Sequence, residues 1–203
     1  MTKTEDARFL FDPYLEWAKG EGVPIIEDFG IDLIKVETKP WARFGTNGAM
    51  AHLKGRGDFI SIFILEVPPG GKCEPQRHVY EEVIYVLEGH GSTTVETHDG
   101  RTHSFEWGPQ SLFALPLNAK YQHFNASGRE SARLSSTNSL CVMLNLFHND
   151  EFIFNNPYRF PEREGSESAF SGEGEFIPKK PGRHMWETNF VPDLTRFKLR
   201  KWS

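Results

Sequence analysis

The sequence has few cysteines, no long apolar run and no excess of positive charge. Its two cysteines in 203 residues, Cys73 and Cys141, lie far apart and give no sign of a secreted disulfide scaffold. No segment approaches the roughly 18 apolar residues that a membrane-spanning helix needs. The net charge is −5, and lysine and arginine are scattered, so a nucleic-acid partner is not expected. These absences predict a soluble protein of the reducing cytoplasm that binds neither membranes nor nucleic acids.

Phenylalanine, glycine and proline are abundant instead. The counts of 17 Phe, 18 Gly and 13 Pro favour short strands joined by tight turns over a helical bundle. Asp99 and Gly100 stand between two alternating segments and predict a hairpin turn. The predicted strands cover residues 31–36, 50–53, 59–67, 81–89, 92–98, 111–116, 121–126, 132–137 and 139–147. Many short strands at even spacing predict an all-β sandwich or barrel.

One short helix is predicted before the strands. Asp12 can cap it, Pro13 suits its first turn, and Gly20 ends it. The expected organisation is an N-terminal arm with this helix (1–30), a β-barrel (31–155) and a C-terminal arm (156–203). The C-terminal arm begins with a polar stretch rich in glycine and proline and then becomes apolar again. Because apolar residues need a surface to cover, this arm is expected to cover the barrel or the partner subunit of a homodimer.

A polar constellation interrupts the apolar pattern before the segment 83–87. Its members are Gly70, Gln76, His78, Glu82 and Gly89, followed downstream by Pro116, Asn118 and His123. This order resembles the two-motif signature of the cupin superfamily, which has a glycine, a His-x-His pair, a glutamate and a closing glycine, then a proline-bearing strand and a third histidine. The resemblance covers roughly residues 59–147. It implies a jelly-roll barrel, also described as a double-stranded β-helix.

The chain departs from this signature at two places. Gln76 stands where the first histidine is expected, which puts the usual four-ligand metal site in doubt. Asn118 stands where a glycine is usual, and two extra residues precede His123. The second change is tolerable because asparagine adopts a left-handed turn more readily than other residues with a side chain.

The resemblance implies a divalent metal held by His78, Glu82 and His123. Gln76 is a weak fourth ligand, a hydrogen-bond partner for the substrate or an ordinary residue at the barrel rim. Residues 76, 78 and 82 also share parity, so their side chains can converge on one face of an extended segment. Two imidazoles and one carboxylate are the set associated with non-haem Fe(II), the first choice of metal here, ahead of Mn, Ni and Zn. Open coordination positions would admit dioxygen and a small-molecule substrate, with Gln76 and Glu82 in catalytic roles. A metal-dependent enzyme, most specifically an Fe(II) dioxygenase, is therefore predicted.

Three further residues are candidates for the lining of a substrate pocket. Phe63 and Tyr121 supply aromatic surface, which is typical of a pocket and still more typical of a core. Asn145 lies on the odd-numbered face of the strand expected at 139–147, where it either lines the pocket or satisfies a backbone group in the core.

Two alternatives to the oxygenase stay open at this point. A metal at the same site could act as a Lewis acid in an isomerase, a lyase or a hydrolase. The chain could also be a non-catalytic cupin module that binds a small molecule. The alternation of apolar and basic residues over 197–200 is similar to an exposed strand at the end of the first half of a two-cupin chain.

Overall fold

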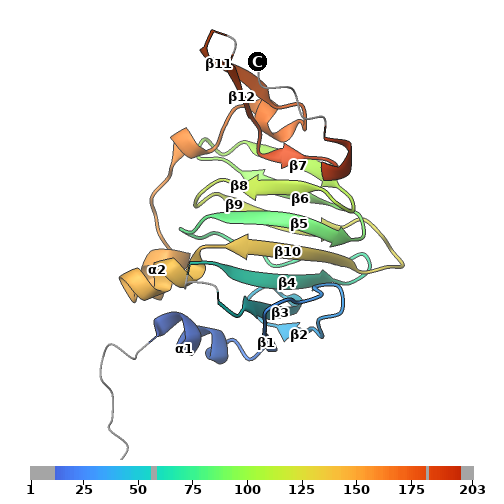
Figure 1. Ribbon diagram of the computed structural model, residues 1–203, viewed down its shortest axis with the longest axis vertical. Coiled ribbons are helices and arrows are strands. Elements are labelled where there is room, and N and C mark those ends of the chain that lie inside the picture. The colour runs from blue at the N-terminus through green and yellow to red at the C-terminus, as the bar shows by residue number, and fades with distance from the viewer. Residues whose placement is uncertain (1–11, 56–58, 182, 198–203) are drawn as a thin grey trace, which may run out of the picture.

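The computed structural model describes residues 12–55, 59–181 and 183–197 (Figure 1). The helices are α1 (Pro13–Gly20), α2 (Leu140–Phe147) and α3 (Asp150–Phe154), with short 3-10 turns η2 (Pro161–Arg163), η3 (Glu167–Phe170) and η4 (Leu194–Arg196). The strands are β1 (Ile25–Asp28), β2 (Lys39–Trp41), β3 (Thr46–Leu53), β4 (Ser61–Val67), β5 (Glu82–Glu88), β6 (Gly91–Glu96), β7 (Thr102–Trp107), β8 (Leu112–Leu115), β9 (Lys120–Asn125), β10 (Ala132–Asn138), β11 (Glu175–Lys180), β12 (Arg183–Glu187) and β13 (Phe190–Val191). Strands dominate, so the predicted all-β fold is confirmed.

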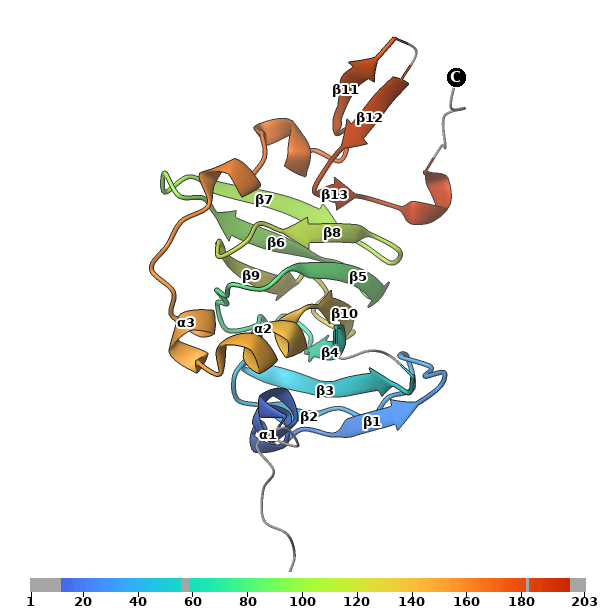
Figure 2. The same cartoon turned by 60° about the vertical axis from the view of Figure 1, so that its left-hand side comes forward.

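Two sheets face each other and form the barrel (Figures 1 and 2). The larger sheet has the order β1-β3-β4-β10-β5-β8-β13, with β2 also paired to β3, and the smaller has the order β7-β6-β9. The segment between β4 and β5 joins them, because bridges link Lys72 to Phe124 and Gln76 to Tyr121. The two sequence segments that carry the polar constellation are therefore neighbours in space.

The core lies between the sheets and extends to α1 and α2. Burial alternates along β6 and along most of β9, as expected for strands with one face toward a core. Burying one large apolar side chain contributes about 1.5–3 kcal/mol, so the interior supplies most of the folding free energy. The largest fully buried side chains are Trp41, Tyr14, Phe44, Phe63, Phe113, Met50, Ile64, Leu65, Ile84, Leu134, Leu140 and Leu144.

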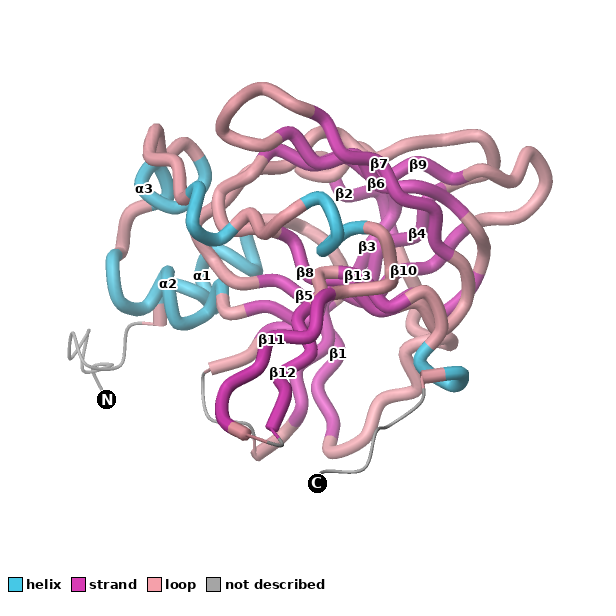
Figure 3. Tube along the Cα trace, turned by 90° about the horizontal axis from the view of Figure 1, so that it is seen from above, coloured by secondary structure: helices cyan, strands magenta, loops and turns pink. Residues whose placement is uncertain are grey.

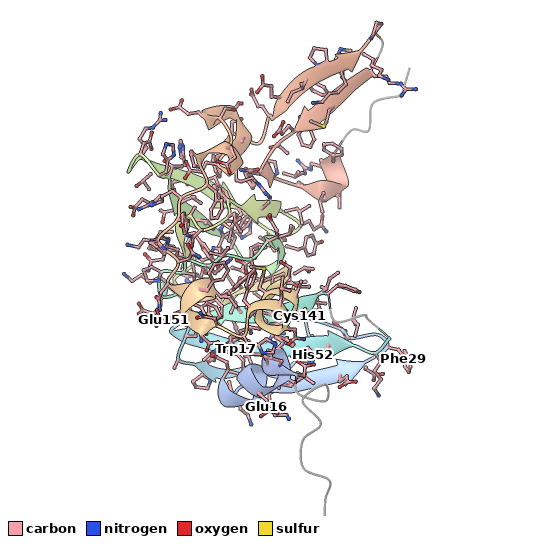
Figure 4. All side chains as sticks on the ribbon, turned by 90° about the vertical axis from the view of Figure 1, so that its left-hand side faces the viewer. Glu16, Trp17, Phe29, His52, Cys141 and Glu151 are labelled. Atoms are coloured by element: carbon pink, nitrogen blue, oxygen red, sulfur yellow. The ribbon has the colours of Figure 1, made fainter. Side chains whose placement is uncertain are left out.

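The helices gather on one side of the barrel (Figure 3). Helix α1 begins and ends as predicted, because the side chain of Asp12 accepts a hydrogen bond from the Leu15 amide at 3.0 Å and Pro13 occupies the first turn. In Figure 4, Trp17 and His52 lie where α1 meets the sheet, while Glu16 lies on the outer side of the helix. No helix within the described ranges has the length and apolar character needed to cross a membrane.

Two turns that the sequence predicts are confirmed. Strands β6 and β7 form the hairpin around Asp99 and Gly100, and Gly100 has a φ of 80°, which favours glycine. Asn118 has a φ of 57°, as expected for the residue that replaces a glycine of the signature.

The prediction of a strand at residues 31–36 is wrong. Residues 33–35 form a turn instead. The buried guanidinium of Arg133 donates hydrogen bonds to the carbonyls of Leu33, Ile34 and Val36, at 3.0 Å for Leu33 and 2.9 Å for Val36. The carbonyls of this segment are thus bound by a side chain of β10, and a compact turn satisfies them without a neighbouring strand.

The strand predicted at 139–147 is also wrong, because residues 140–147 form helix α2. The helix buries Leu140, Cys141 and Leu144, whose spacing fits one helical face, and leaves Leu146 exposed. Asn145 consequently lines no pocket in the barrel. Its Oδ1 accepts a hydrogen bond from the Tyr14 amide at 2.9 Å and so links α2 to the start of α1.

The C-terminal segment adds one short strand to the barrel. Strand β13 pairs with β8, and Phe190 packs against Phe105 and Phe113. The hairpin of β11 and β12 projects beyond this edge (Figure 2). Leu199 and Arg200, on which the two-cupin interpretation partly depends, lie outside the described residues. Coverage of a partner subunit and the homodimer stay predictions.

Candidate functional site

A cluster of four polar side chains lies inside the barrel, and we call it the Glu82 cluster. His78 precedes β5, Glu82 begins β5, Tyr121 lies on β9 and Ser136 lies on β10. His78 Nε2 is 3.0 Å from Glu82 Oε2, and the Tyr121 hydroxyl donates to the same oxygen at 2.6 Å. The Ser136 hydroxyl donates to Glu82 Oε1. Every member is at least 96% buried, so the cluster connects both sheets without contacting solvent.

The hydrogen bonds of the cluster are satisfied internally. His78 Nδ1 faces the Tyr80 carbonyl oxygen at 3.1 Å, and the Tyr80 ring stacks on the imidazole with centroids 3.4 Å apart. Both imidazole nitrogens of His78 therefore have oxygen partners, and Nε2 also lies 3.1 Å from the Tyr121 hydroxyl. Ser136 Oγ also accepts a hydrogen bond from Nδ2 of the Asn138 side chain at 3.1 Å.

Burial and hydrogen bonding act in opposite directions on Glu82. Burial raises the pKa of its carboxyl group, but the hydrogen bond and charge of His78, with the hydroxyls of Ser136 and Tyr121, outweigh burial and hold the pKa below its usual range. Burial, followed by the Glu82 charge, raises the pKa of Tyr121 well above its ordinary value. Tyr121 is therefore a neutral phenol that donates its proton to the carboxylate.

His123 belongs to a different buried network. Its Nδ1 lies 2.8 Å from the hydroxyl oxygen of Thr93, which accepts a hydrogen bond from the Trp107 indole at 2.9 Å. The other ring nitrogen, Nε2, is buried and makes no hydrogen bond within the described part of the chain. Burial lowers the pKa of His123 from 6.5 to about 4, with a smaller opposing effect from Glu82, so the ring is neutral near pH 7.

The structure brings together only part of the predicted metal site. His78 and Glu82 meet, whereas His123 bonds to Thr93 and Gln76 lies at the surface, where its Nε2 donates to the Arg43 carbonyl at 2.9 Å. Over the three described ranges, no three His, Cys, Asp or Glu side chains are grouped so that they could share a metal ion. As placed, these side chains do not fit the ligand set that the signature implies.

Sequence reasoning assigned Tyr121 to a pocket or the core and missed its hydrogen bond to Glu82. The signature expects its last histidine two residues before His123, and that position is occupied by Tyr121. The structure confirms this spacing, because the Tyr121 side chain is the one on β9 that reaches Glu82. Placing the last position of the second motif at its usual distance from Pro116, with no insertion, would have identified Tyr121.

Phe63 belongs to the core and does not line an open pocket. It is 1% exposed, and its ring lies 5.1 Å from that of Trp41 and 6.2 Å from that of Phe44. Of the two roles that the sequence left open for Phe63, its burial therefore favours the core. The apolar side chains around it close this end of the interior.

A cleft of about 780 Å³ opens at the surface beside the buried cluster, and we call it the Arg77 cleft. Its lining comes from the end of α1, the turn between β2 and β3, the segment before β5, the start of β9 and the end of α3. The lining residues are Gly20, Glu21, Ala42, Arg43, Pro75, Gln76, Arg77, Lys120, Phe154 and Asn155. Gln76 and Lys120 connect it to the Glu82 cluster, because the backbone of Gln76 pairs with that of Tyr121.

Comparison with known proteins supports the cupin resemblance over the central part of the chain. Residues 63–143 match the family model described as Cupin domain, which confirms the cupin resemblance. Oxalate decarboxylase of Lactobacillus farciminis, solved as a formate complex, is 18% identical with a TM-score of 0.45 over 53% of this chain and 32% of that one. The cupin domain of Schizosaccharomyces pombe Cnp3 is 20% identical with a TM-score of 0.44 over 54% of this chain and 72% of that one.

A third similar structure is the vicilin of Solanum lycopersicum, tomato. It is 14% identical with a TM-score of 0.46 over 55% of this chain and 32% of that one. This chain thus spans about a third of the length of both the decarboxylase and the vicilin. The search of curated proteins found no match.

Replacing Tyr121 by phenylalanine tests the Glu82 cluster. The variant removes one donor from a buried carboxylate, so we expect the free energy of unfolding to fall by about 1–3 kcal/mol. Urea denaturation measures the change. Tyr85→Phe is the matched control, because Tyr85 is only half-buried, and should alter stability by less than about 0.5 kcal/mol. Equal effects of the two variants would contradict the role assigned to the cluster.

The neutral state of His123 predicts a specific pH dependence of stability. Between pH 6.5 and about 4 the unfolded chain protonates this histidine while the folded chain does not, so acidification in this window favours unfolding. The contribution approaches about 3 kcal/mol at the lower end of the window. The variant His123→Gln cannot titrate and should lose this component. Urea denaturation of both proteins across the window checks it, and a difference in stability that does not change with pH would contradict it.

Proposed function

We propose, with the cupin domain of this chain as the premise, that the protein is a binding module that holds a small organic anion in the Arg77 cleft. The observation that carries the proposal is the charge of the cleft lining. Three basic residues, Arg43, Arg77 and Lys120, line it together with one carboxylate, Glu21. A concave surface with surplus positive charge concentrates anions, and guanidinium groups suit carboxylate and phosphate geometry.

Arg77 is the basic residue best placed to contact a ligand. Its guanidinium donates to the carbonyl oxygens of Asn118 at 3.2 Å and Tyr158 at 3.4 Å, so it is oriented by neutral groups and its charge is not compensated there. Burial, followed by the charge of Arg159, lowers the pKa of Arg77, while Glu96 acts in the opposite direction. The effect of Arg159 places a further cation near this side of the cleft.

Lys120 and Gln76 supply the remaining polar contacts. The ammonium group of Lys120 lies 4.0 Å from Glu96 in an exposed pair, which contributes little and can be exchanged for a ligand. Both hydrogen bonds recorded for the Gln76 side chain are donated by its Nε2, to the carbonyls of Arg43 and Glu74. The ring of Phe154 adds an apolar wall. This lining suits a small molecule with one or more anionic groups and an apolar body.

The Glu82 cluster supports binding as the main activity. Both carboxylate oxygens of Glu82 already accept hydrogen bonds from buried partners, and the phenol of Tyr121 is held neutral by its surroundings. These groups link the two sheets next to the backbone bridge between Gln76 and Tyr121. A rigid base preserves the shape of the cleft when a ligand enters.

Metal-dependent catalysis on a small organic molecule is the second candidate, and a non-haem Fe(II) dioxygenase is its most specific form. One observation favours it, since the Nε2 of His123 is a buried nitrogen without a partner in the described part of the chain. Neutral imidazole nitrogen is a frequent metal ligand. An isomerase, a lyase or a hydrolase would use the same donors. Because the donors do not form a shared set as placed, no catalytic step is assigned to a metal.

The anion proposal is tested by titrating the full chain with sodium succinate, sodium benzoate and inorganic phosphate in calorimetry. At least one of these should bind saturably, and the carboxylates and phosphate distinguish the two anion chemistries. Arg77→Met should weaken that binding by about tenfold or more, because a charged hydrogen bond contributes about 1.5–3 kcal/mol. Arg129→Met, at an exposed loop position, should leave it unchanged. Unaltered binding in Arg77→Met, or no binding of any anion by the parent, would overturn the proposal.

Iron uptake separates the two candidate functions. The chain is purified without an affinity tag or added metal and then offered Fe(II) anaerobically, and its metal content is measured. A binding module should retain iron well below one ion per chain, with no difference between the parent and Glu82→Gln. Stoichiometric iron that is lost in both His78→Gln and His123→Gln would establish the second candidate in place of the first.

A further inference from the structure

The carboxylate of Glu21 occupies a cradle of donors at one wall of the Arg77 cleft. The Arg43 guanidinium binds it with two nitrogens, Nε at 3.0 Å from Oε2 and a terminal nitrogen at 2.6 Å from Oε1. The indole of Trp41 donates a third hydrogen bond to Oε2 at 2.6 Å. Two parallel bonds from a planar guanidinium are the geometry that selects a carboxylate over a spherical anion. We call this set of donors the Arg43 cradle.

The cradle is rigid. The Arg43 guanidinium carbon lies 4.2 Å from the centroid of the Phe154 ring and 5.2 Å from that of the Trp17 ring, so two aromatic side chains hold the fork in place. Trp41 is 1% exposed and packs edge-on against Phe44 and Phe63. Donors that are ordered before binding bind a carboxylate with a small loss of entropy.

The carboxylate in the cradle belongs to a residue at the end of α1 that is flanked by two glycines. Glu21 is the C-cap of α1, and it stands between Gly20 and Gly22. A Cβ added at either glycine would meet no atom within 4 Å, so open space adjoins both glycines, although the amides of Glu21 and Gly22 are bonded to carbonyls of α1. The side chain of Glu21 is 13% exposed and faces the cleft that the cradle also lines.

We propose that the Arg43 cradle is a carboxylate subsite of the cleft and that Glu21 competes with the ligand carboxylate for it. The proposal rests on the proposed function, because a ligand in the cleft is what would displace Glu21. Exchanging one carboxylate for another conserves all three hydrogen bonds. The balance is therefore decided by the ligand's contacts with the rest of the cleft, where Arg77 and Lys120 offer further positive charge. An anion therefore displaces Glu21 only if it binds the cleft more favourably than Glu21 does, which weak or monodentate anions do not.

Replacing Glu21 by alanine tests the competition, with acetate as the probe. The variant leaves the donors of Arg43 and Trp41 without their internal partner, so it should unfold at a lower temperature than the parent. Sodium acetate should restore the unfolding temperature saturably, whereas sodium chloride at the same ionic strength should not. Half-saturation should need about tenfold less acetate in the variant than in the parent, because the competing group is gone.

Three further variants keep the test decisive. Glu21→Gln retains the shape of the side chain and, should the alanine variant fail to fold, its acetate titration decides the question. Glu16→Ala removes an exposed carboxylate from the same helix and should respond to acetate as the parent does. Adding Arg43→Met to Glu21→Ala should abolish the rescue. Rescue that persists without Arg43, or no rescue by acetate in either Glu21 variant, would overturn the proposal.

The outcome is distinguishable from that of the proposed function. Saturable binding of succinate, benzoate or phosphate that depends on Arg77 but is unaffected by Glu21 variants would leave the cleft intact and remove the competition. Acetate rescue of Glu21→Ala, combined with no Arg77-dependent binding of any anion, would leave a carboxylate cradle without a wider ligand site.

Discussion

The burial of one carboxylate constrains the rest of this barrel. Glu82 is 2% exposed, and a charge that is removed from water persists only if hydrogen bonds and an opposite charge replace its hydration. Its partners come from the segment before β5, from β9 and from β10, so one side chain requires three separate parts of the chain to meet. The side chains that bond to Glu82 are thereby occupied, and a ligand must be bound by other residues.

Because the buried carboxylate of Glu82 is satisfied by its own partners, the charges available to a ligand lie at the surface of the barrel. The backbone pair of Gln76 and Tyr121 marks the boundary, with Tyr121 directed to the buried carboxylate and Gln76 to the cleft. The Trp17 ring contacts both the Arg43 guanidinium and the core residue Phe63. Core packing and ligand recognition thus share side chains, which explains how a cleft can be rigid although five separate segments build it.

Local signals succeeded where a single turn of chain decides the conformation. Asp12 and Pro13 start a helix through their own hydrogen-bonding properties, and Asp99 with Gly100 reverses the chain for the same reason. The segment 139–147 failed because its residues are apolar on nearly every side, and such a run fits a strand or a helix equally well. Packing against α1 then selected the helix, through contacts more than a hundred residues apart in sequence.

The sequence by itself indicated the cupin architecture, through the order of its two motifs, and the meeting of His78 with Glu82, which are close in sequence and are brought together by a bend at residues 79–80. Only the tertiary structure decided which residue of β9 would join them. Tyr121 and His123 are separated by two positions, so they point to the same face of the strand, and parity cannot distinguish between them. They differ by roughly 6.6 Å along the strand. The register between the two sheets places Tyr121 within hydrogen-bond distance of Glu82 and places His123 beside Thr93 instead. This register depends on the closure of the whole barrel.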